Sequence, residues 1–153
     1  MTLPRLRILL FNTAHRWVGE AASTDLLART MAARGHNVAM VIPESGSTVG
    51  EHLEKHPERI QNIELIRVPW RLMQGRGSGS RAQFLAVRRL LKSWQPDIIH
   101  AARSKEHWCA ALLRPITAPR ARIIRTRHVV LPMRERITSK WLFTKGTDAA
   151  LAV

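Results

Sequence analysis

Short apolar runs alternate with segments of helical periodicity along the whole chain, and this rhythm restricts the fold more than any other feature. The run Arg7–Asn12 contains four consecutive large apolar residues, which is typical of a strand covered on both faces. The next segment, Ala21–Arg34, has apolar side chains at helical spacing, and Gly35 follows it as a C-terminal cap. The alternation predicts an α/β fold with a doubly wound, mostly parallel, Rossmann-like sheet and helices on both faces.

The pattern predicts that strands and helices alternate along the whole chain. The expected strands are Arg7–Asn12, Asn37–Ile42, Ile63–Val68, Pro96–His100, Arg122–Thr126 and Ala149–Val153. The expected helices are Ala21–Arg34, Thr48–His56, Arg81–Trp94, Lys105–Leu113 and Arg136–Lys145. The glycine-rich segment from Arg71 to Ser80 interrupts the pattern, and we interpret it as an exposed loop, because the alternation resumes after it. Residues 1–153 therefore form one predicted domain.

Length and composition exclude several classes of protein. A chain of 153 residues with 45 % apolar residues is able to bury a core, which excludes a disordered tail. Cys109 has no partner within the chain, so a disulfide scaffold is excluded, and we expect this cysteine to pack in the core. The sequence contains neither a run of about 18 uncharged apolar residues nor a signal-peptide pattern at its start. We expect a cytoplasmic protein.

Positive charge is concentrated in the second half of the chain. Residues 71–153 contain 17 Lys and Arg against 4 Asp and Glu, a net charge of +13, whereas residues 1–70 are nearly neutral. This asymmetry favours a partner that is a polyanion, an anionic membrane surface or a phosphorylated substrate. An Arg-rich composition without functional meaning is the alternative. Membrane or acceptor contact is considered for the loop from Arg71 to Arg81, whereas the following helix is expected to face the core.

No metal site is predicted, although the chain has seven histidines. His52 and His56 have the i, i+4 spacing of a helical metal site, but Pro57 adjoins them and no third ligand is evident.

Four motifs, in this order, resemble the N-terminal domain of family 4 glycosyltransferases, which have the two-domain GT-B architecture. The motifs are Arg7-Ile-Leu-Leu with Gly19-Glu20, Leu27-Ala28 through Arg34-Gly35-His36-Asn-Val38, Trp94-Gln-Pro-Asp-Ile-Ile-His100, and Ile124-Arg-Thr-Arg-His128 ahead of Thr147–Val153. The resemblance covers nearly the whole chain, and the segment around Arg-Thr-Arg-His is its most specific part. Within the family, the sequence looks closest to enzymes that build lipopolysaccharide cores and other bacterial surface glycans.

The resemblance implies the acceptor-binding half of a retaining enzyme that needs no metal or other cofactor. Such an enzyme moves a sugar from a nucleotide-sugar donor to a cell-surface glycan, a lipopolysaccharide core or a lipid-linked acceptor, and works at the inner face of the cell membrane. Two departures from the family pattern stand out. Val18 replaces the first of two glycines in the first loop, and no pair of Glu matches the signature of the nucleotide-sugar domain. We therefore expect that domain to be absent from this chain, and the fragment alone to be inactive.

The candidate site residues follow strands at the carboxyl edge of the sheet, where open α/β folds bind ligands. Gly19 and Glu20 precede the first helix, where backbone N–H groups suit a phosphate, although they also suit an ordinary turn and helix start. The resemblance implies that His128 faces the reacting sugar as a catalytic residue, whereas a surface histidine is the alternative. Arg127 is its companion for binding an anionic group of the substrate.

Arg103, Ser104 and Lys105 complete the predicted substrate-binding set after the fourth strand. Ser104 is expected to cap the next helix, and the two cations are expected to hold an anionic acceptor or to be merely solvated. Two other functions stay open: a basic nucleic-acid-binding module, and a nucleotide-binding doubly wound domain of another kind. The first lacks stacking aromatics among its basic residues, and the second lacks the G-x-G-x-x-G fingerprint, so no nucleic acid is expected.

Overall fold

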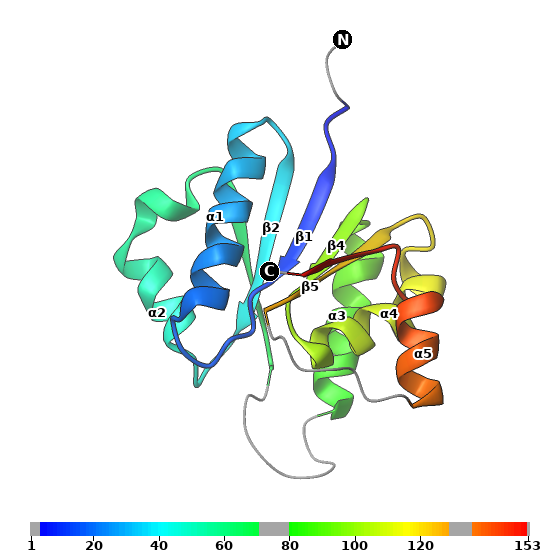
Figure 1. Ribbon diagram of the computed structural model, residues 1–153. Coiled ribbons are helices and arrows are strands. Elements are labelled where there is room, and N and C mark those ends of the chain that lie inside the picture. The colour runs from blue at the N-terminus through cyan, green and yellow to red at the C-terminus, as the bar shows by residue number, and fades with distance from the viewer. Residues whose placement is uncertain (1–3, 71–79, 129–135, 153) are drawn as a thin grey trace.

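Six strands form one parallel sheet in the computed structural model, which describes residues 4–70, 80–128 and 136–152 (Figure 1). The strands are β1 (Arg7–Phe11), β2 (Asn37–Pro43), β3 (Ile63–Val68), β4 (Ile98–Ala101), β5 (Arg122–Arg127) and β6 (Ala149–Ala152). Their order across the sheet is β3-β2-β1-β4-β5-β6, and each neighbouring pair is parallel. The strand order therefore reverses between β1 and β4, in the middle of the sheet.

Helices cover both faces of this sheet, as Figure 1 shows. On one face lie α1 (Gly19–Ala33) and α2 (Thr48–Lys55), with the short 3₁₀ helix η1 (Pro57–Ile60). On the other face lie α3 (Ser80–Trp94), α4 (Ser104–Thr117) and α5 (Ile137–Thr144). The predicted doubly wound α/β class is confirmed.

The central strand β1 contributes side chains to two separate cores. Successive residues of a strand point to opposite faces, and all of Ile8, Leu9, Leu10 and Phe11 are buried. Ile8 and Leu10 pack in the core beneath α1 and α2, whereas Leu9 and Phe11 pack in the core beneath α3, α4 and α5. An uninterrupted apolar run is therefore what this position in the sheet requires.

Some details differ from the sequence prediction. The helix α4 continues to Thr117 through Pro115, beyond the expected end at Leu113. Proline usually ends a helix, but here the Thr117 hydroxyl donates to the Leu113 carbonyl at 2.8 Å and helps to complete the last turn. The helix α3, expected to face the core, does so through Val87, Leu91 and Trp94, but Phe84 near its start is 37 % exposed. Most of the glycine-rich loop, residues 71–79, lies outside the described residues.

Candidate functional site

The reversal of strand order places two loops next to each other at the carboxyl edge of the sheet. β1 continues into α1 on one face, and its neighbour β4 continues into α4 on the other face. Two connections that part in this way leave a crevice between them, which is where ligands bind in open α/β sheets. Both helices begin here, so their N-terminal N–H groups lie at the same edge.

Gly19 is the first residue of α1 and has open space where a side chain would be. Val18 precedes it in an extended conformation and makes no side-chain capping bond. A Cβ atom added to Gly19 would meet no atom of the described protein within 4 Å. Packing within the protein therefore does not require a glycine at this position.

Glu20 and Arg103 form an ion pair between the two loops. The distance from Arg103 NH1 to Glu20 Oε1 is 3.6 Å, and the side chains are 44 % and 24 % exposed, respectively. The structure thus brings together two residues that the sequence assigned to the substrate site from separate motifs. Their charges partly neutralise each other at the mouth of the crevice.

The expected capping role of Ser104 is wrong. Arg103 occupies the N-cap position, with an extended backbone of φ −120° and ψ 154°, and Ser104 is the first helical residue. Glu106 instead binds the backbone just before the helix, because its Oε2 accepts from Ala102 N and Arg103 N at 2.9 and 2.8 Å. Ser104 and Lys105 are instead exposed beside Arg103, where both side chains are available to a ligand.

Glu106 is the main residue of this edge that the sequence prediction missed. Its side chain is completely buried, and its other oxygen, Oε1, accepts from the backbone N–H and the hydroxyl of Thr13, just after β1. A glutamate three residues after a helix N-cap is a known capping pattern, so the bonds to Ala102 and Arg103 had a signal in the sequence. The bonds to Thr13 had no signal in the sequence, because they depend on the pairing of β1 with β4.

Burial dominates the electrostatics of Glu106. Burial, with a smaller contribution from the negative charge of Glu20, raises the pKa of this carboxyl to about 7, although hydrogen bonds from Thr13 and Arg103 oppose the rise. The carboxyl therefore titrates near neutral pH, far above the usual range of a glutamate.

Arg127 and His128 lie at the end of β5, the strand next to β4. Both residues are half-buried. The neighbouring His100, on β4, is buried and bonded through Nε2 to Thr126 Oγ1 at 2.8 Å. The pKa of His100 is lowered to about 4, mainly by burial and also by the nearby charges of His128 and Arg125. His128 is therefore close enough to His100, on β4, for its charge to affect the pKa of that residue.

Arg125 links the residues at the ends of β1, β4 and β5. It is buried on β5 and donates from NH1 to the Ala101 carbonyl at 3.2 Å. Burial lowers its pKa, Glu106 and Glu20 raise it, and Arg127 and Arg103 lower it. All four charged residues are therefore near one buried guanidinium, which places Glu20, Arg103 and Arg127 of the predicted set together at one edge of the sheet.

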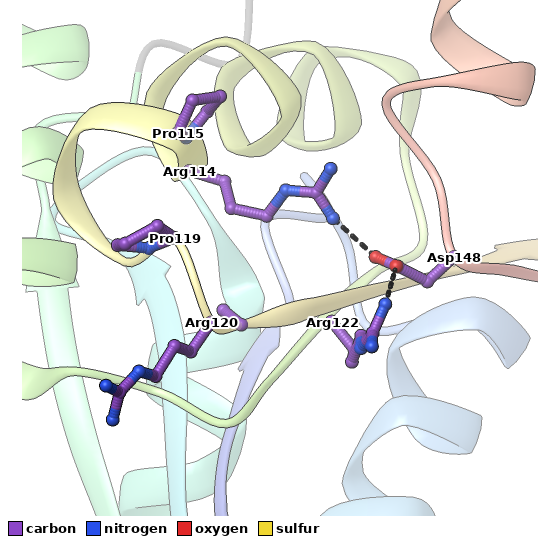
Figure 2. A pocket seen from close by; sticks show the side chains of 7 residues that line it. Arg114, Pro115, Pro119, Arg120, Arg122 and Asp148 are labelled. Carbon is purple, nitrogen blue, oxygen red and sulfur yellow. Dashed lines mark hydrogen bonds and ion pairs between the residues drawn. The ribbon is translucent and has the colours of Figure 1, made fainter.

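A pocket of about 560 Å³ lies at the opposite, amino edge of the sheet and does not overlap this set (Figure 2). The residues that line it are Arg114, Pro115, Pro119, Arg120, Ala121, Arg122 and Asp148. Asp148 accepts from Arg114, from Arg122 NH1 at 2.8 Å and from Ile123 N at 2.8 Å. The Asp148 carboxylate therefore links the start of β6 to β5 and α4 through hydrogen bonds. We assign the pocket a structural role.

The His52 and His56 pair is explained by ring packing. Trp17 stacks on His52 with ring centroids 3.8 Å apart, and His52 lies 4.6 Å from His56. Across residues 4–70, 80–128 and 136–152, no three His, Cys, Asp or Glu side chains gather in a way that would hold a metal ion.

Cys109 is buried, as predicted, and burial raises the pKa of its thiol to about 12. Among the described helices, none has both the length and the hydropathy of a membrane span.

The fold is that of a doubly wound α/β domain, and the candidate residues lie at its topological switch point, where open α/β sheets generally bind ligands. The sequence model of the family described as Glycosyltransferase Family 4 matches residues 19–153. The chain belongs to this family. No curated protein matches it.

Two solved structures share the fold. A glycosyltransferase from Rickettsia africae has 19 % sequence identity and a TM-score of 0.58, and the match covers 91 % of this chain and 34 % of that one. MurG from Acinetobacter baumannii has 11 % identity and a TM-score of 0.68, with 98 % and 41 % covered. The chain thus spans less than half the length of either protein. The resemblance to the N-terminal domain of GT-B family 4 glycosyltransferases is confirmed.

Proposed function

We propose that this chain is the acceptor-binding half of a retaining glycosyltransferase that takes its sugar from a nucleotide-sugar donor. The acceptor is a cell-surface glycan, a lipopolysaccharide core or a lipid-linked glycan. The observation that carries the proposal is the Glu20–Arg103 ion pair, because it joins the two connections at the switch point into one polar surface. Membership of the family favours sugar transfer over the nucleic-acid-binding alternative.

Six of the seven predicted residues contact the substrate in this proposal, and Glu20 acts through its ion pair with Arg103. Arg103, Lys105 and Arg127 bind the phosphate or carboxylate of an anionic substrate, and the Ser104 hydroxyl adds a hydrogen bond. Gly19 lets the substrate approach the backbone, since the space beside it is open. His128 faces the reacting sugar and bonds to one of its hydroxyls as the bond to the anomeric carbon changes.

A second domain completes the proposed enzyme. We place the nucleotide-sugar donor mainly in a C-terminal domain beyond Val153, and the reaction in the cleft between the two. The matched proteins are more than twice as long as the part that this chain resembles, which supports a second domain. No metal ion or other cofactor takes part in the proposed transfer.

We also propose that the enzyme works at the inner, cytoplasmic face of the cell membrane. Phe84 and Leu85 are 37 % and 46 % exposed on α3, beside the exposed Arg81, Arg88 and Arg89. Apolar side chains among cations suit a surface of anionic lipid headgroups.

The experiment that tests the function measures sugar transfer by the full-length enzyme to a phosphorylated glycolipid acceptor at increasing salt. Transfer and acceptor binding should weaken as salt rises, because the contacts are electrostatic, and vesicles with anionic lipids should recruit the protein, whereas neutral vesicles should not. Equal recruitment to both would refute the membrane contact, and binding that does not depend on salt would refute the role of the cations.

A further inference from the structure

One buried carboxylate, that of Glu106, connects the two strand ends at the switch point. Its Oε1 accepts from Thr13 N at 3.1 Å and from the Thr13 hydroxyl, and its Oε2 accepts from Ala102 N and Arg103 N. The side chain has no exposed surface. All four hydrogen bonds run toward the carboxylate, so both of its oxygens act only as acceptors.

Helix capping explains only half of these bonds. A capping glutamate returns to the backbone just before its own helix, as Oε2 does here. Oε1 instead binds Thr13, 93 residues earlier in the sequence and on a different strand end. A glutamate that served its helix alone would leave Oε1 toward solvent, where a carboxylate is best hydrated.

The position of these contacts relates them to the candidate site. Thr13 opens the connection that leads to Gly19 and Glu20, and Arg103 is both a donor to Glu106 and the partner of Glu20. The carboxylate therefore bonds to the backbone of both connections that the ion pair joins.

We propose that Glu106 is a positioning residue, which fixes the end of β1 against the start of α4 so that Glu20 and Arg103 face each other across the anion-binding site. This inference rests on the proposed function, since that function assigns the site.

The charges around Glu106 add a dependence on pH. Glu20 on α1 has the same sign, whereas Arg125 on β5 and Arg103 at the start of α4 have the opposite sign. Burial raises the pKa of Glu106 to about 7. A proton on Oε2 would point at the N–H donors of Ala102 and Arg103, whereas a proton on Oε1 can be accepted by the Thr13 hydroxyl. The hydrogen bonds of Thr13, Ala102 and Arg103 to this carboxyl should therefore change together near neutral pH.

The first test measures the affinity for inorganic pyrophosphate in wild type, Glu106→Gln, Thr13→Val and Thr13→Ser. Glu106→Gln keeps the size but replaces one acceptor oxygen by a donor, and should weaken binding about tenfold. Thr13→Val should weaken it about threefold, while Thr13→Ser, which keeps the hydroxyl, should bind like wild type. Folded variants with lower thermal stability and unchanged affinity would overturn the proposal, since that is the result of a structural role alone.

The second test needs no ligand and no variant. The backbone amide protons of Thr13, Ala102 and Arg103 should titrate in NMR spectra with one shared midpoint near neutral pH, because one carboxylate accepts from all three. Separate midpoints, or no titration, would overturn the inference even if pyrophosphate binds. If the amides titrate together but wild type binds no pyrophosphate, the proposed function is wrong and the link between the loops is upheld.

Discussion

Arg103 and Glu20 form an ion pair that spans the two faces of the sheet. Glu20 stands at the start of α1, which covers one face, and Arg103 caps α4, which covers the other. Both side chains are partly exposed, and exposed pairs contribute at most about 1 kcal/mol to stability. The pair matters because it sets the charge at the mouth of the crevice, where a negative ligand has to compete with Glu20 for Arg103.

This competition predicts opposite effects of two substitutions on the binding of inorganic pyrophosphate. Arg103→Ala should weaken binding about tenfold, because it removes a charged hydrogen-bond donor. Glu20→Gln should strengthen binding roughly threefold, because it removes a negative charge near the ligand. Isothermal titration calorimetry at low salt measures both. Arg120→Ala, which removes an exposed arginine at the opposite edge, is the control and should leave the affinity unchanged.

The sequence predicted the elements whose formation depends on the local spacing of apolar residues. Apolar runs such as Ile8–Phe11 identify strands, and the parallel sheet that their alternation with helices predicts places residues after the strands, such as Arg103 and His128, at one edge. The contacts of Glu106 with Thr13 were not predictable, because a glutamate in a first helical turn is usually solvated, and its burial here follows from the neighbouring end of β1. Ser104 was assigned as the cap on residue type alone, whereas the backbone places Arg103 there.

Gly19 and Gly146 offer a matched pair of substitutions with opposite expected effects on stability. Gly146→Ala should lower the free energy of unfolding by about 1–3 kcal/mol, because the new Cβ would lie 2.8 Å from the Leu142 carbonyl oxygen. Gly19→Ala should leave stability unchanged or raise it by up to about 1 kcal/mol, since the space is open and alanine favours helix. Urea denaturation measures both values.

The proposed function adds a second readout for the same pair. Gly19→Ala should weaken pyrophosphate binding although the protein is stable, because its methyl group occupies the space next to the N-terminus of α1. An affinity equal to that of wild type would show that no ligand approaches Gly19 closely.

Asp148→Asn should lower the free energy of unfolding by about 1–3 kcal/mol through the loss of charged hydrogen bonds. Burial raises the pKa of Asp148, but the Ile123 N–H and the guanidiniums of Arg122 and Arg114 outweigh it and hold this pKa below its usual range. The charged form therefore stabilises the folded state above pH 3.8, and that contribution is lost as pH falls through the lowered pKa. The destabilisation by the asparagine variant should therefore shrink in strong acid, which thermal unfolding at several pH values measures.

Two buried histidines predict a loss of stability in mild acid. Burial lowers the pKa of both His100 and His107 from 6.5 to about 4. Between these values the unfolded chain binds more protons than the folded protein, so the free energy of unfolding should fall as pH decreases from 6.5 to 4. Glu106 acts in the opposite direction, since its raised pKa makes the folded state bind the extra proton between about pH 4.5 and 7.

His107→Gln tests this account. Glutamine keeps a group able to bond to Thr147 Oγ1, 2.6 Å from His107 Nε2, but binds no proton in this range. The variant should lose less stability than wild type between pH 6.5 and 4, by an amount on the order of 3 kcal/mol. His15→Gln, at an exposed position, is the control. Equal pH dependence in wild type and His107→Gln would show that His107 does not titrate with a lowered pKa.

His128 is the residue whose proposed role is most directly tested by catalysis, in the full-length enzyme. It is half-buried just after β5, beside the buried His100. If His128 contacts the reacting sugar mainly in the transition state, His128→Ala should lower kcat by about 100-fold or more, which corresponds to roughly 2.7 kcal/mol. His128→Gln, which keeps a hydrogen-bonding group, should retain part of the rate if orientation matters more than charge. His56→Ala removes an exposed histidine at the end of α2 and should leave kcat unchanged. Turnover near that of wild type in both His128 variants would remove this residue from the reaction.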